Sequence, residues 1–90
     1  MTLTAEELQQ LNKDVVEHFQ NENYSEAIKI GVQAVNFGKQ KLGLKHPNTA
    51  TAISNLALLY DRVGDHDRAE PLHQWKQQQW ENFSWETQAV

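Results

Sequence analysis

Three side chains near the end of the chain have the types and the spacing to bind a metal ion. His66, Glu70 and His73 lie at i, i+4 and i+7, which places them on one face if this stretch is helical. Imidazole nitrogens and carboxylate oxygens are ordinary ligands of zinc and nickel. The His-Glu-x-x-His pattern of zinc enzymes is not present, so a metal-binding helix face is kept only as a minor alternative. We expect no metal and no other cofactor.

Catalysis is not indicated elsewhere in the sequence. The candidate nucleophiles are Ser25, Ser54 and Ser84, which lie in helical or capping contexts, and none has a general base at a recognisable spacing. The sequence also has no glycine-rich loop that could hold a phosphate. The acidic residues are spread along the chain, as is usual for the solvent-exposed faces of helices. We therefore expect that the protein is not an enzyme.

The composition of the chain predicts one small soluble domain. The chain has 90 residues, of which 39% are hydrophobic, and it carries no cysteine and a net charge of -4. Acids and bases are interspersed, which argues against a nucleic-acid partner. No apolar run approaches the roughly 18 to 20 residues that span a bilayer, so no membrane partner is expected. The start, MTLTAEELQQL, does not resemble a secretory signal, and the expected location is the cytoplasm.

Apolar residues recur at intervals of three and four, which predicts helices. The first helix begins near Thr4, and the polar run 21–23 ends it. The second runs toward Gly43, the third extends from Pro47 to Gly64, and the fourth follows Asp65. The sequence therefore predicts four helices and no strand.

Capping residues mark the starts of these helices. Asn23 is expected to cap the second, His46 the third and Asp65 the fourth. Pro71 lies past the first turn of the fourth helix, so we expect a local kink or a shifted start there.

The two halves of the chain align with each other at a shift of 42 residues. Val15 then meets Ala57, and Ala27 meets Ala69. Small side chains at such positions let neighbouring helices approach closely. A helix pair that recurs at a fixed interval predicts a solenoid of antiparallel helix hairpins.

The segment LGLKHPNTATAISNLALLYDRVGDHDRAEPL, residues 42–72, resembles a tetratricopeptide repeat of the 42-residue kind found in kinesin light chains. It matches the pattern LGxxHPxTAxxxxNLAxLYxxxGxxxxAEPL, and residues 11–35 are a more divergent copy. The resemblance covers most of residues 8–74. It implies an all-α fold in which two repeats, at about 4–43 and 47–74, stack as a short right-handed α-solenoid. It also implies that His66 and His73 take positions of aromatic packing residues.

The resemblance further implies a non-catalytic module that binds a protein or peptide partner. In this family the first helix of each pair lines a concave groove that holds a peptide or a helix. Asn55 is the leading candidate for a hydrogen bond to the ligand backbone, and Lys13 and Arg62 could attract acidic groups. A clamp for a terminal carboxylate is not expected, because the matching asparagine and basic positions are incomplete. The residues placed on the concave face are Gln9, Asn12, Lys13, Val16, Phe19 and Gln20, with Thr51, Ser54, Asn55, Leu58, Asp61 and Arg62.

The repeat pattern stops after Gln74, and a tail rich in tryptophan and glutamine occupies 75–90. Trp75, Trp80 and Trp85 are five residues apart, so a helix would turn them by roughly 140° per step and they would not share a face. A cap, an interaction segment and a truncation product all remain possible, with a partly helical cap preferred. Because two repeats leave an apolar face open, we also expect a homodimer through the end formed by the third and fourth helices. Structural self-assembly is the alternative function.

Overall fold

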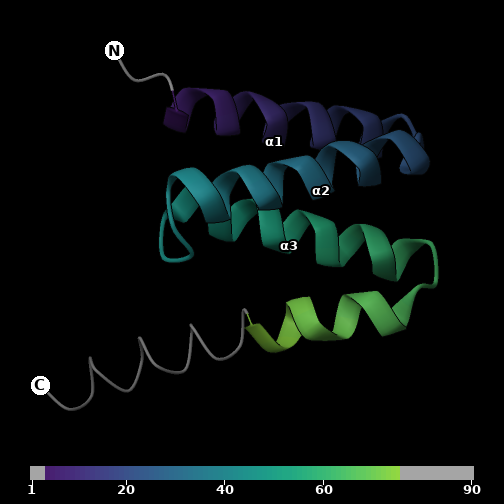
Figure 1. Ribbon diagram of the computed structural model, residues 1–90. Coiled ribbons are helices and arrows are strands. Elements are labelled where there is room, and N and C mark those ends of the chain that lie inside the picture. The colour runs from purple at the N-terminus through teal and green to yellow at the C-terminus, as the bar shows by residue number, and fades with distance from the viewer. Residues whose placement is uncertain (1–3, 76–90) are drawn as a thin grey trace, which may run out of the picture.

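The computed structural model describes residues 4–75, and all regular structure in that range is α-helical. Helix α1 spans Thr4–Gln20, α2 spans Tyr24–Lys41 and α3 spans Pro47–Arg62. A further helix, called here the 66–75 helix, closes the described part. The chain reverses direction after each helix, so α1 pairs with α2 and α3 pairs with the 66–75 helix (Figure 1). The predicted stack of helix hairpins is confirmed, while the expectations for Trp80 and Trp85 lie outside the described residues.

A continuous hydrophobic core joins all four helices. Leu8 of α1, Val35 of α2, Leu56 of α3 and Ala69 of the 66–75 helix belong to one buried cluster, against which Trp75 packs. Each large side chain that is removed from water stabilises the fold by roughly 1.5–3 kcal/mol. A second cluster lies where the α1–α2 turn meets α3, and its buried members are Val15, Ala27 and Leu59.

Two glycines set how closely α2 packs on its neighbours. A Cβ on Gly38 would lie 2.6 Å from the hydroxyl oxygen of Thr49 and 3.1 Å from a methyl carbon of Leu8. A Cβ on Gly31 would lie 3.1 Å from a methyl carbon of Leu56. Helix α2 therefore approaches α3 and α1 too closely at Gly38 to admit even one more methyl group.

The turn after α1 and the turn after α3 have the same backbone form. Glu22 has a φ of 60° and Gly64 a φ of 83°, so both lie in the left-handed region, 42 residues apart in the sequence. In both turns the next residue donates its backbone N–H to the carbonyl five residues earlier, at 2.8 Å. These bonds run from Asn23 to His18 and from Asp65 to Tyr60.

Two of the predicted caps are present. The ring nitrogen Nδ1 of His46 accepts a hydrogen bond from the backbone N–H of Asn48 at 3.0 Å, immediately before the first helical residue Pro47. The carboxylate of Asp65 accepts from the backbone N–H of Arg68 at 3.3 Å.

The cap predicted at Asn23 is wrong, and so is the shifted start, which was one of the two alternatives expected from Pro71. The side chain of Asn23 makes no cap hydrogen bond and instead lies 3.4 Å from the Nδ1 atom of His18. The start of the last helix is not shifted by Pro71, because the helix begins at residue 66 and continues past the proline to residue 75. Asp65 fixes the start by capping the first turn.

Candidate functional site

Helices α1 and α3 lie parallel and contact each other at both ends. The side-chain amide of Asn48 donates to the backbone carbonyl of Ala5 at 3.3 Å. At the other end, the guanidinium of Arg62 lies over the ring of Phe19, 5.2 Å from its centroid. The surface between these two contacts is called here the α1–α3 face.

Helical spacing determines which side chains lie along this face. Val16 and Phe19 lie on α1 at i and i+3, and Asn55, Leu58 and Arg62 lie on α3 at i, i+3 and i+7. Val16 is 42% exposed and Leu58 is 47% exposed, although both are large apolar residues. The α1–α3 face therefore offers apolar side chains to solvent, as a protein-binding surface does.

Arg62 and Phe19 form a preorganised pair at one end of the face. The Phe19 ring packs edge-on against Tyr24, with 5.6 Å between ring centroids and an interplanar angle of 64°. This packing fixes the ring over which the guanidinium lies. Arg62 has no ion pair with any residue in 4–75.

The polar residues expected on the face have different surroundings. Lys13 and Gln20 are exposed, and Ser54 is half-buried. Thr51 is exposed, but its hydroxyl donates to the backbone carbonyl of Pro47 at 3.0 Å.

Asn12 differs from the surface position that the sequence suggested. It is only 7% exposed, and its amide donates to the backbone carbonyl of Asn48 at 3.1 Å. The residue therefore holds α1 against the start of α3. Its oxygen Oδ1 is buried and has no hydrogen-bond partner within the described chain.

Asn55 lies half-buried on α3, and its amide nitrogen has no hydrogen-bond partner among residues 4–75. A buried donor without an acceptor costs about 1–3 kcal/mol. The terminal torsion of an asparagine side chain is broad, so the amide can turn toward the surface. Within residues 4–75, Asn55 therefore has an unsatisfied amide donor.

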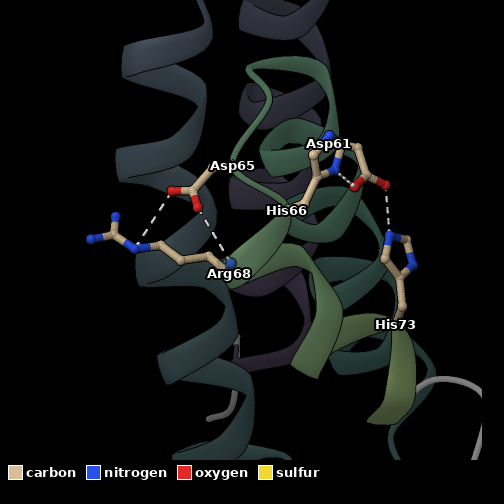
Figure 2. A network of polar contacts seen from close by, with 5 residues as sticks. All are labelled: Asp61, Asp65, His66, Arg68 and His73. Atoms are coloured by element: carbon tan, nitrogen blue, oxygen red, sulfur yellow. Dashed lines mark hydrogen bonds and ion pairs between the residues drawn. The ribbon is translucent and has the colours of Figure 1, made fainter.

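His66 and His73 do not pack into the core, so that expectation is wrong. Their side chains are 76% and 50% exposed, and both approach the carboxylate of Asp61 at the end of α3 (Figure 2). Nε2 of His73 lies 2.6 Å from Oδ2, and Nδ1 of His66 lies 3.4 Å from Oδ1. Sequence spacing put both histidines on one helix face, but it gave no sign that Asp61 of another helix would meet them.

The contacts with these two histidines also change the pKa of the Asp61 carboxyl. The hydrogen bond with His73 holds the pKa of this carboxyl below its ordinary value of 3.8, and His66 acts in the same direction. Glu70, the third residue of the suggested metal site, instead accepts from the amide of Gln74 at 3.2 Å. The part of the chain from 4 to 75 holds no group of three histidine, cysteine or acidic side chains arranged to bind a metal ion.

A separate apolar groove lies between α2 and the 66–75 helix, with a volume of about 370 Å³. Val35, Leu56 and Tyr60 line it together with Val32, which is 37% exposed. Lys39 from α2 and both Asp67 and Arg68 from the 66–75 helix add charges of both signs to the lining. This groove, called here the α2 groove, was not indicated by the sequence pattern.

Stacked helix hairpins whose small residues lie at the helix crossings define a helical repeat protein. A family model described as "Tetratricopeptide repeat" matches residues 17–75, which is more than half of the chain. The chain therefore belongs to the tetratricopeptide repeat family. Proteins of this family generally mediate protein–protein interaction or assembly, and their repeats are generally non-catalytic.

Searches of curated proteins and of solved structures gave no match. Among the described residues, no helix is both long enough and apolar enough to cross a membrane.

Proposed function

We propose that the protein binds a peptide or a helix of another protein on the α1–α3 face. The observation that carries this proposal is the exposure of two large apolar side chains, Val16 at 42% and Leu58 at 47%, on a face that ends in the Arg62–Phe19 pair. Apolar anchors beside an arginine are typical of binding hot spots.

The chemistry of the face favours a partner that combines apolar and acidic side chains. Arg62 and Lys13 are exposed cations, and a guanidinium binds a carboxylate through two parallel hydrogen bonds. Asn55 supplies an amide for the backbone of the ligand. A protein partner fits better than a nucleic acid, because the chain has a net charge of -4 and its basic residues are interspersed with acidic ones.

A displayed library of random peptides tests this proposal. We expect enriched peptides to carry acidic and apolar residues, and to lose binding to Leu58→Asp and Arg62→Glu variants. Asn55→Ala should weaken binding by about two- to tenfold, which is the usual net worth of one hydrogen bond. Val32→Asp in the α2 groove serves as the matched control and should bind normally. Peptides that bind the Leu58→Asp and Arg62→Glu variants as tightly as the unmodified protein would contradict the assignment.

We also propose that the repeats are of the 42-residue type found in kinesin light chains. Recurrence of the left-handed turn residues at Glu22 and Gly64 supports this period, as does the burial of Ala27 and Ala69. The His46-Pro47 start of α3 matches the same pattern.

Self-association through α3 and the 66–75 helix is a second candidate function. The α2 groove favours it, because Val32 is 37% exposed there beside further apolar lining. Sedimentation over a wide range of concentrations should then show a dimer that the Val32→Asp variant weakens. A monomer at all concentrations would exclude this alternative.

A further inference from the structure

One carboxylate ties the end of α3 to both ends of the following helix. Asp61 lies in the last turn of α3, whereas His66 and His73 lie two helical turns apart in the 66–75 helix. Each histidine contacts a different oxygen of Asp61, at 3.4 Å and 2.6 Å (Figure 2). The three residues are called here the Asp61 cluster.

Within the described chain, the other charged groups near this cluster make no ion pair with Asp61. No further ion pair reaches Asp61 from α1, α2 or the remaining described residues. Arg68 instead pairs with Asp65 at 3.6 Å, and Arg62 lies over the ring of Phe19. Glu70 accepts a hydrogen bond from Gln74. Asp67 and Lys39 line the α2 groove. Protonation of the two histidines therefore acts mainly on Asp61.

Histidine changes its charge between about pH 5 and pH 8, and an ionised carboxylate can only accept hydrogen bonds. A neutral imidazole can donate one N–H bond to the ionised carboxylate. When the imidazole is protonated, the same contact becomes an ion pair, which adds attraction between opposite charges to the hydrogen bond. Because the histidines bind different oxygens, both contacts can strengthen together.

We propose that the Asp61 cluster is a pH-dependent clamp that holds the 66–75 helix most firmly against α3 in mildly acidic solution. The clamp needs a charged Asp61, and the histidine contacts that lower the pKa of this carboxyl keep it charged in that range. Only strong acid, below the lowered pKa of Asp61, releases it.

A double-mutant cycle measures the clamp directly. The unmodified chain, Asp61→Asn, His73→Gln and the double variant are unfolded in urea near pH 8, pH 5.5 and pH 2.5. The coupling of Asp61 with His73 should change the unfolding equilibrium constant by about 1.5- to 5-fold near pH 5.5, as exposed ion pairs do. It should be smaller near pH 8, and it should also be smaller near pH 2.5 than near pH 5.5, because acid begins to protonate the carboxylate of Asp61. All substituted side chains are half-exposed or exposed, so the variants should fold.

Asp67→Asn combined with His73→Gln is the matched control, because Asp67 lies six residues before His73 on the same helix and faces the α2 groove instead. This control cycle should show no coupling at any pH. Coupling between Asp61 and His73 that is equal at pH 8 and pH 5.5, or larger at pH 8, would overturn the proposal. His66→Gln in place of His73→Gln should show the same pH trend with a smaller coupling, since its contact is longer. A His66 coupling without this trend would confine the clamp to His73.

Discussion

Glu22 occupies a backbone conformation that glycine suits better. Its φ of 60° matches the left-handed turn that Gly64 adopts with a φ of 83° in the second repeat. An L-residue with a side chain is disfavoured in this region by roughly 1–2 kcal/mol, whereas glycine is not. The first repeat therefore has a strained residue, Glu22, at the position where the second repeat has an unstrained glycine, Gly64.

Exchanging Glu22 for glycine should stabilise the protein by about 0.5–1 kcal/mol, because relief of this strain exceeds the added freedom of the unfolded chain. The reciprocal change Gly64→Ala should destabilise by about 1 kcal/mol, although nothing lies within 4 Å of its added Cβ. Urea unfolding of both variants tests the pair. A loss of stability in Glu22→Gly would show that the side chain of Glu22 contributes more than its backbone costs.

Residue roles were only partly predictable from the sequence. His46 and Asp65 cap their helices as expected, because a cap is decided by a few neighbouring positions. Asn12 was assigned to a ligand-binding surface, yet it donates to Asn48, which is 36 residues away. A single sequence carries no signal for such a contact between helices.

At the scale of elements, the helix pattern was predictable and the packing between helices was less so. Four helices and their turns are explained by apolar spacing and by Gly43, Pro47 and Gly64. The Asp61 cluster was missed because its carboxylate and its histidines belong to different helices. The α2 groove was missed for the same reason, since three helices line it.

The crossing of α2 with its neighbours gives a prediction at this scale. Gly38→Ala should be less stable than Gly31→Ala by about 1–3 kcal/mol, the usual cost of overpacking. Helix propensity cancels in this comparison because both glycines lie within α2. The Cβ at position 38 would lie 2.6 Å from the hydroxyl oxygen of Thr49 and 3.1 Å from Leu8, which are both fully buried. The Cβ at position 31 would lie 3.1 Å from one methyl carbon of Leu56, and its next neighbour would be 3.8 Å away.

Thermal or urea unfolding of the two alanine variants, with helicity checked by circular dichroism, measures the difference. Equal stability of the two would mean that Thr49 can move aside, and that α2 and α3 are less tightly packed than their distances indicate.

For the whole molecule, the shared core predicts cooperative unfolding. One buried cluster contains Leu8, Val35, Leu56 and Ala69, which come from four successive helices. Removing any helix exposes the others, so the two repeats should unfold together despite their repetitive sequence.

Calorimetry tests this cooperativity. The calorimetric and van't Hoff enthalpies of unfolding should agree, and circular dichroism should give the same midpoint as hydrogen exchange of α1 amides. Two resolved transitions would show instead that each hairpin folds as a separate unit.

Trp75 packs against the common core at the last described position, and its indole nitrogen is buried without a hydrogen-bond partner in the described part of the chain. An indole in such surroundings emits at shorter wavelength than one in water. Replacing Trp80 and Trp85 with phenylalanine would leave Trp75 as the single tryptophan of the protein. The protein thus contains its own optical probe for the docking of its 66–75 helix, which needs no attached dye.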